Sequence, residues 1–265
     1  MKTLLLRLTG PMQSWGTQSR FSYRDTEMEP SKSGVIGLLC AALGRPRSHP
    51  VDDLARLRMG VRVDREGIMQ VDFHTAGGTH RKGDSYGVAK ADGSKPQPVT
   101  SQRYYLADAD FLVGLESHDE ALLRQLDQAL AHPKWPLYLG RKSFVPAGPV
   151  PIGYRPPDFP GPPEFAGIIY LPLEEVLHNY PWIPRTLREK EKKLAEIESE
   201  HQAGRALRLR MVLDAPFGST AEVRHDVPLS FADRSFTIRY VETRLLPGNA
   251  SHHHVCLSFP ANPCG

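Results

Sequence analysis

Cysteine is scarce in this sequence, which has three in 265 residues and no CxxC pair. The odd set of Cys40, Cys256 and Cys264 argues against a disulfide framework or a structural zinc site and is typical of a reducing cytoplasm. Long apolar runs are also absent, since no stretch of about 18 consecutive apolar residues occurs, so we expect no transmembrane helix. The first apolar run is broken early by Arg7, which is unlike a signal peptide.

Two signatures of ligand sites are missing as well. The GxxxxGK[ST] spacing of a phosphate-binding P-loop does not occur. His252 and His254 would lie on one face of a strand, as a metal-binding pair does, but the sequence offers no third ligand beside them. We therefore expect neither a metal ion nor a cofactor.

Acidic residues are missing from a segment where basic ones gather. Residues 134–155 carry four Lys and Arg and no Asp or Glu. Together with residues 1–50 and 74–105 they hold 16 basic and five acidic residues, whereas the rest of the chain holds 17 and 25. This asymmetry is typical of a protein with one basic face, and such a face is suited to nucleic acid.

The order of the expected elements indicates an α+β fold. Apolar patterns and caps predict strands at residues 3–9, 61–63, 69–73, 103–117 and 148–154, and helices at residues 31–44, 49–60 and 117–130. This approximates the βαββαβ order of a ferredoxin-like, RRM-like domain, and RNA-recognition modules use that fold among many others.

The chain changes character near residue 155. Eight prolines between residues 146 and 163 indicate a boundary, so we divide the chain into a domain of residues 1–155 and a smaller β-rich part of residues 156–265. In the second part we expect strands at residues 167–173, 206–216, 235–246 and 253–259. A polar helix is predicted over residues 185–201, where Leu187, Leu194 and Ile197 form a narrow apolar stripe.

The stretch GPMQSWG, residues 10–16, follows the first strand directly. Glycine and proline turn the chain, but a turn does not need the amide of Gln13 or the indole of Trp15. A loop at a strand end could place both against an RNA base, with Met12 and Ser14 beside them. The alternative is a tryptophan that closes the core, and on size alone we expect Trp15 to be mostly buried.

Two further stretches could contact phosphates. Ser31, Lys32 and Ser33 stand where a helix begins, so free N–H groups, hydroxyls and an ammonium could converge on one phosphate. Simple capping by serine is the alternative there. In YLGRKS, residues 138–143, Arg141 and Lys142 follow a glycine without acidic neighbours, which fits either phosphate contact or a solvated turn.

The segment of residues 75–101 is long, rich in glycine and without a periodic pattern. Its basic residues predict a mobile basic arm, and a plain flexible insertion is the alternative. These basic residues are Arg81, Lys82, Lys90 and Lys95.

Nucleolytic chemistry would need a general base and a group that stabilises charge on phosphate. Suitable side chains are those of His74, His80, Lys82 and Tyr104, but nothing in their spacing brings them together.

Taken together, LRLTGPMQSWG, RFSYRDTEMEPSKSGVIGLLCAALGR and YLGRKS closely resemble the CasD family, type I-E CRISPR-associated proteins of the RAMP superfamily. The match is specific in order and spacing over residues 4–45, and YLGRKS supports it. The resemblance implies a ferredoxin-like domain with an inserted thumb hairpin, here residues 75–101, and a smaller β-rich C-terminal part. It also implies a non-catalytic subunit of the Cascade complex that caps the 5′ handle of the CRISPR RNA (crRNA) in antiviral defence.

Carried onto matching positions, the resemblance places handle binding on the opening turn, the helix start and the basic loop. These residues are Met12, Gln13, Ser14, Trp15, Ser31, Lys32, Ser33, Tyr138, Arg141, Lys142 and Ser143, with Arg103 and Tyr104 as a weaker addition. The implied partners are the crRNA, the backbone RAMP subunit that the thumb contacts, the large subunit of Cascade and, indirectly, the target DNA. Relatives in a sister subtype cleave repeat RNA themselves, so a metal-independent endoribonuclease is the alternative function.

Overall fold

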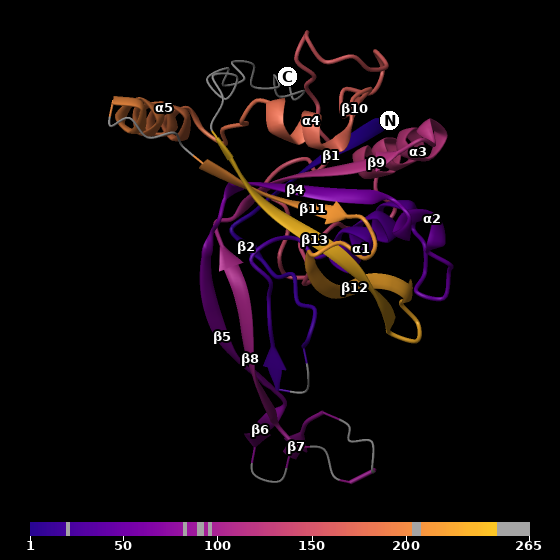
Figure 1. The fold of residues 1–265 in the computed structure, drawn as a ribbon. Coiled ribbons are helices and arrows are strands. Elements are labelled where there is room, and N and C mark those ends of the chain that lie inside the picture. The colour runs from indigo at the N-terminus through magenta and orange to yellow at the C-terminus, as the bar shows by residue number, and fades with distance from the viewer. Residues whose placement is uncertain (20–21, 82–83, 89–92, 95–96, 203–207, 248–265) are drawn as a thin grey trace, which may run out of the picture.

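The computed structural model describes the chain except for residues 20–21, 82–83, 89–92, 95–96, 203–207 and 248–265. The described part is a mixed α/β structure that is rich in strands (Figure 1). Its helices are α1 (Lys32–Leu43), α2 (Asp52–Ala55), α3 (Glu120–Ala131), α4 (Leu173–Asn179) and α5 (Leu187–Gln202). No helix in these ranges is long and apolar enough to cross a membrane.

Seven strands form the main sheet in the order β10-β1-β9-β4-β11-β13-β12, and each neighbouring pair is antiparallel. They are β1 (Lys2–Thr9), β4 (Arg58–Arg65), β9 (Asp110–Ser117), β10 (Ile168–Ile169), β11 (Arg208–Ala215), β12 (Glu222–Ser230) and β13 (Ser235–Pro247). The C-terminal strands join the N-terminal ones where β11 pairs with β4. Both parts of the chain therefore share one sheet, and the division at residue 155 stays a prediction.

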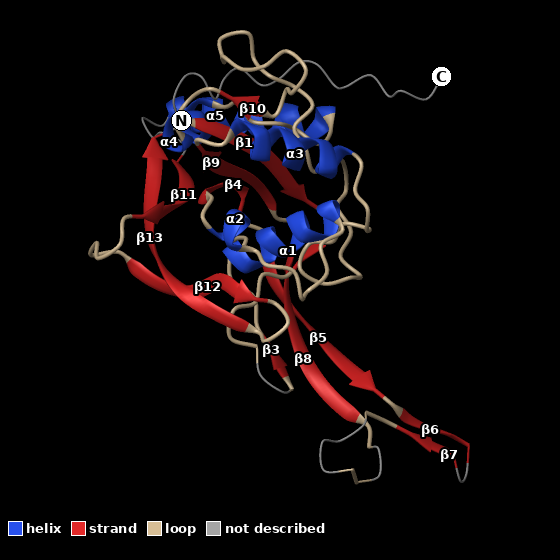
Figure 2. Ribbon diagram, turned by 90° about the vertical axis from the view of Figure 1, so that its right-hand side faces the viewer, coloured by secondary structure: helices blue, strands red, loops and turns tan. Residues whose placement is uncertain are grey.

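Helices cover both faces of the main sheet (Figure 2). Helices α1 and α3 contact each other, and the cluster beneath them contains Leu4, Leu6 and Leu8. Helix α4 packs on the opposite face, where Leu5 and Leu112 are buried. The alternation along β1 follows from the pleat, which points successive side chains to opposite faces, so the first strand is buried on both sides.

A second sheet forms around two long strands, β5 (Ile68–Ala76) and β8 (Val99–Ala107), which pair from Ile68↔Ala107 to Ala76↔Val99. We call β5 and β8 the projecting ribbon, because they extend away from the main sheet and carry β6 (Gly78–Arg81) and β7 (Asp84–Tyr86) near their far end (Figures 1 and 2). Two short strands pair with β8, β2 (Met12–Gln13) antiparallel and β3 (Tyr23–Arg24) parallel. The opening turn and the segment of residues 16–29 are therefore both attached to β8 of the ribbon.

The expected final strand at residues 148–154 is corrected. This segment makes only an isolated bridge between Leu6 and Pro151, and the edge of β1 is completed by β10. Proline explains the difference, because Pro149 and Pro151 lack the N–H groups that a ladder needs. The strand expected at residues 167–173 is accordingly shorter and lies beside β1.

Other boundaries are corrected too. The strand predicted over residues 103–117 is two strands, β8 and β9, with Asp108 at a φ of 64° between them. The helix expected from residue 117 begins later, at Glu120, and Asp119 caps it by accepting from Leu122 N at 3.0 Å. The segment of residues 75–101 begins and ends in the projecting ribbon and contains β6 and β7. The strand expected at residues 253–259 lies outside the described residues.

Candidate nucleic-acid interface

Gln13 fixes the turn after β1 from inside the protein. Its Nε2 donates to Leu8 O at 3.1 Å and to Ala109 O at 2.9 Å, and its Oε1 accepts from the Trp15 indole at 3.2 Å. The side chain is fully buried, and these three bonds engage both amide N–H groups and the carbonyl. The prediction that Gln13 contacts a base is therefore corrected, because the amide holds the turn instead.

Trp15 is 1% exposed, as its size suggested. Its ring lies against Gly34 of α1, where a Cβ would stand 2.7 Å from the Trp15 Cε3. This close approach explains why a glycine stands inside the helix, where it would otherwise be destabilising. The enclosed indole cannot stack on RNA in this fold, so Trp15 supports the turn and does not line the surface.

Ser14 joins the turn to two other segments of the interface. Its backbone N donates to Leu139 O at 3.1 Å and its Oγ donates to Tyr104 O at 3.1 Å. Met12 pairs with Ala107 in β2 and packs, half-buried, against the core. The opening turn therefore sets the relative position of β8 and the loop of residues 138–143.

The predicted phosphate site at the start of α1 is occupied by the protein's own carboxylates. Ser31 caps the helix by accepting from Gly34 N at 3.3 Å, and its Oγ lies 3.5 Å from that of the half-buried Ser33. Lys32 donates from its backbone N to Asp226 at 2.7 Å and from Nζ to Asp214 at 2.8 Å. The capping alternative is confirmed, and the expected convergence on phosphate is corrected.

Arg239 completes this buried charge cluster, since it donates to both Asp226 and Asp214. Burial on its own would raise the pKa of Asp214, but Lys32 and Arg239 outweigh it and hold that pKa below its usual value. The cluster thus attaches the start of α1 to β11, β12 and β13.

The loop of residues 138–143 brings Arg141 to the projecting ribbon. Its Nη2 donates to Tyr104 O at 2.9 Å and to Arg24 O at 3.4 Å. Gly140 has a φ of +89°, and a Cβ there would stand 1.6 Å from Ser14 O. Only glycine allows this approach of the loop to the turn. The remaining predicted residues of the loop differ in exposure, with Tyr138 half-buried and Lys142 and Ser143 exposed.

Three arginines meet where the loop reaches the ribbon. Arg24 and Arg103 are paired neighbours on β3 and β8. Burial lowers the pKa of the Arg141 guanidinium, and the nearby charges of Arg103 and Arg24 lower it further, against the opposing effect of Asp72 and Asp25. An anion at this position would relieve the repulsion. We call the following residues the basic cluster: Arg24, Arg103, Arg141 and Lys142.

An aromatic pair lies on the opposite face of the ribbon. The Tyr23 and Tyr104 rings have centroids 5.0 Å apart, and Tyr23 is 51% exposed. No local signal in the sequence marks Tyr23 and Arg24 as site residues, although RFSYRD, residues 20–25, lies within the stretch that resembles the family. Adjacent residues of a strand point to opposite faces of the sheet, so β3 carries the Tyr23 ring on one face and the Arg24 cation on the other.

The candidate nucleolytic residues are separated. His74 Nδ1 lies 3.3 Å from the Asp72 carboxylate on β5. His74 pairs with Ser101 and Val71 pairs with Tyr104, so His74 and Tyr104 fall on opposite faces of the ribbon. The side chains of His80 and Arg81 are not described, and Lys82, Lys90 and Lys95 lie outside the described residues, as do His252 and His254. Within the described ranges, no group of three or more His, Cys, Asp or Glu could hold a metal.

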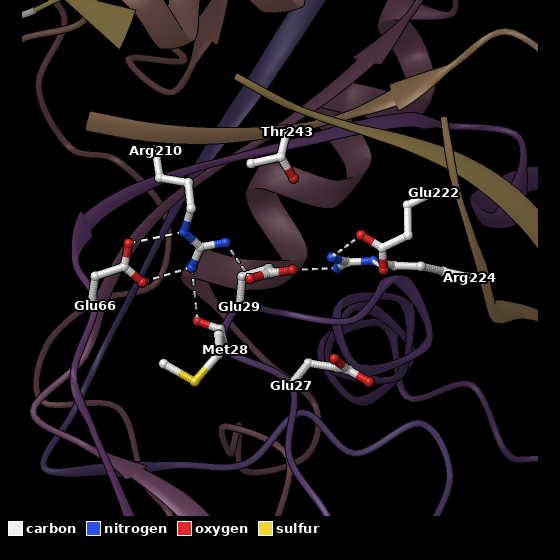
Figure 3. Close-up of a pocket in the computed structure, with 8 residues that line it drawn as sticks. All are labelled: Glu27, Met28, Glu29, Glu66, Arg210, Glu222, Arg224 and Thr243. Carbon is white, nitrogen blue, oxygen red and sulfur yellow. Dashed lines mark hydrogen bonds and ion pairs between the residues drawn. The ribbon is translucent and has the colours of Figure 1, made fainter. Parts of the chain in front are cut away.

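A pocket of about 340 Å³ lies between the end of the segment of residues 16–29, which contributes Glu29, and strands β11 and β12, which contribute Arg210 and Arg224. Figure 3 shows Glu29 between two arginines, with Arg210 also bonded to Glu66 and Arg224 also bonded to Glu222. Burial favours a higher pKa for Glu29, but the two arginines outweigh it and the pKa is lowered. These ion pairs attach the segment that carries Tyr23 and Arg24 to β11 and β12.

Comparison with known proteins identifies the family. A family model described as CRISPR-associated protein (Cas_Cas5) matches residues 3–242. The CRISPR system Cascade subunit CasD of Escherichia coli (strain K12) is 32% identical over 167 residues, which cover 57% of this chain and 70% of that protein. A crystal structure of a Cas protein has a TM-score of 0.64 and 39% identity, covering 92% of this chain and 95% of that one. A chain from a CRISPR RNA-guided surveillance complex has a TM-score of 0.71 and 34% identity, covering 94% and 92%. The chain therefore belongs to the Cas5 family of CRISPR-associated proteins.

Proposed function

We propose that the protein is a non-catalytic subunit of a Cascade-type, RNA-guided surveillance complex and binds the 5′ handle of crRNA in antiviral defence. Its family, its similarity to a Cascade subunit and its similarity to a chain from a surveillance complex support the assembly. The observation that carries RNA binding is the basic cluster, where Arg24 and Arg103 are paired neighbours and Arg141 donates to the Arg24 carbonyl. Cations gathered in this way bind single-stranded RNA through its phosphates.

The fold proposal is a ferredoxin-like unit with an inserted thumb. The strand order β10-β1-β9-β4, with α1 and α3 on one face, supports the ferredoxin-like unit. The projecting ribbon supports the thumb, which then begins earlier than residue 75. Met69, Val71 and Phe73 are exposed on one face of β5, as a surface for a neighbouring subunit would be. The backbone and large subunits of the complex, and target DNA indirectly, are the partners proposed here.

Removing two cations from the basic cluster tests RNA binding. We expect Arg141→Ala with Lys142→Ala to weaken binding of handle RNA and to reduce the slope of log K against log salt by about 1.4, since each phosphate contact contributes about 0.7 for a single strand. Fluorescence anisotropy at several salt concentrations measures this slope. The matched control is Arg188→Ala with Lys192→Ala, which removes two exposed cations from α5. Equal slopes for both double variants and the wild type would contradict the proposal.

The alternative is a metal-independent endoribonuclease. One observation favours it, because His74 beside Asp72 lies on the Arg103 face of the ribbon and has the side chain of a general base. Our proposal expects labelled repeat RNA to stay intact when incubated with the protein in a chelating buffer. Gel electrophoresis of the RNA checks this. Cleavage at the handle junction that is lost in His74→Ala, or in Tyr104→Phe, would replace the non-catalytic proposal by the nuclease.

A further inference from the structure

Trp135 differs in exposure from the other two tryptophans of the chain. Trp15 and Trp182 are 1% and 6% exposed, whereas Trp135 is 46% exposed. Tryptophan is enriched at binding interfaces, where its indole offers a large flat face, so the half-exposed indole of Trp135 is a candidate contact. Trp135 lies in the loop between α3 and the basic cluster, just before the motif YLGRKS.

The backbone at Trp135 is held in place. Trp135 N donates to Ala41 O at 3.1 Å and Lys134 N donates to Ala42 O at 3.0 Å, so the loop is attached to the last turn of α1. Pro133 and Pro136 flank the pair and restrict the backbone further. The backbone that carries the indole is therefore preorganised, which lowers the entropic cost of binding.

The sequence on both sides of Trp135 is basic. No Asp or Glu occurs between residues 128 and 157. Lys134 is exposed at its head, while its methylene groups cover Gly44 at the end of α1, where a Cβ would stand 2.6 Å from Lys134 Cδ. His132 and Arg47 are exposed in the two turns that follow α3 and α1. A tryptophan among exposed cations suits a nucleic-acid strand better than an apolar protein surface.

The loop continues from Trp135 to the basic cluster. Arg141 is six positions after Trp135, a span of at most about 20 Å. Leu139 is buried between them and Tyr138 is half-buried, so the loop follows the protein surface over this distance. A single strand bound at Arg141 could reach Trp135 within a few nucleotides.

We infer that the RNA surface extends along residues 132–143 and that Trp135 stacks on a base of single-stranded RNA, with Lys134 at the adjoining phosphate. The inference rests on the proposed function, because the strand must first be held at the basic cluster. Trp135 is then a second point of contact, and affinity rises with RNA length until the strand reaches it.

The test uses the full chain and two RNAs from the handle sequence, about four and about eight nucleotides long. We expect Trp135→Ala to weaken binding of the longer RNA about tenfold, the usual scale for losing one stacked base, and to leave the shorter RNA unchanged. Trp135→Phe keeps an aromatic face and should restore most of the loss. Because the other tryptophans are buried, the longer RNA should also quench wild-type fluorescence, and Trp135→Phe should remove this quenching.

The outcomes separate the two proposals. If the wild type binds neither RNA, the proposed function fails and the inference fails with it. If the wild type binds both RNAs but Trp135→Ala matches it and quenching is absent, only the inference is overturned. Loss of assembly with other subunits by Trp135→Ala, with RNA binding intact, would assign the patch to a protein partner and also overturn the inference.

Discussion

Gln13 shows how much depends on a single buried amide. Its three bonds connect β1, the turn between β8 and β9, and the Trp15 indole. Each partner would remain buried without it, and a buried polar group without a hydrogen bond is more costly than the bond is stabilising. We therefore expect a substitution of Gln13 to affect the stability of the protein more than its affinity for RNA.

We expect Gln13→Leu to lower the free energy of unfolding by about 3 kcal/mol, because two carbonyls and the indole N–H lose their partner. Urea titration followed by circular dichroism measures the change. Gln18→Leu is the control, since Gln18 is exposed and belongs to the same segment. An equal, small effect of both substitutions would contradict the role assigned to Gln13.

For Gln13 and Lys32 the sequence suggested contacts with RNA, whereas the structure shows partners within the protein. Lys32 and Asp214 are 182 positions apart, and Gln13 and Ala109 are 96 apart. A local motif cannot show a partner at such a distance, so a lysine at a helix start suggested a free cation. The burial of Trp15 was predicted correctly, because size alone favours it.

At the scale of elements, Glu29 attaches the segment of residues 16–29 to the main sheet. This carboxylate, 3% exposed, joins Arg210 of β11 and Arg224 of β12. Its pKa in the folded chain is below the ordinary value of 4.5. A carboxyl group with a lowered folded pKa contributes stability above its unfolded pKa, and this contribution is lost as the pH falls through the folded pKa.

We therefore expect the wild type to lose stability as the pH falls below about 4.5, and Glu29→Gln to lack this part of the loss. At pH 7 the substitution should cost about 3 kcal/mol, because it leaves two arginines with one partner fewer in a largely buried site. Urea titrations from pH 7 to pH 3 measure both effects. Glu191→Gln, exposed on α5, is the control. Parallel losses for wild type and Glu29→Gln would show that Glu29 does not carry the pH dependence.

Element boundaries were predictable where the signals were local. Ser31 and Gly44 delimit α1 as expected, because caps act within a few residues. The strand at residues 148–154 was wrong, since an apolar stretch interrupted by prolines cannot complete a ladder. Strand β12 was missed because its side chains alternate poorly, with Asp226 and Pro228 in its interior.

At the scale of the molecule, the family was predicted correctly from residues 4–45, and the family model confirms it over residues 3–242. The excess of basic residues in three segments suggested one basic face, and residues of all three meet in the basic cluster: Arg24, Arg103, Arg141 and Lys142. What composition could not predict is that β11 to β13 extend the main sheet. Their pairing with β4 depends on contacts far apart in sequence, which local patterns do not contain.

The two faces of the projecting ribbon carry different side chains, and this limits how its length can vary. Its β5 strand places Asp72 and His74 on the face that carries Arg103, and Val71 and Phe73 on the face that carries Tyr104. Insertion of one residue in each strand would rotate the distal half by one position and exchange these faces beyond that point. Under the proposal that the Arg103 face binds RNA and the other face a neighbouring subunit, the ribbon can therefore lengthen or shorten only by two residues per strand at a time.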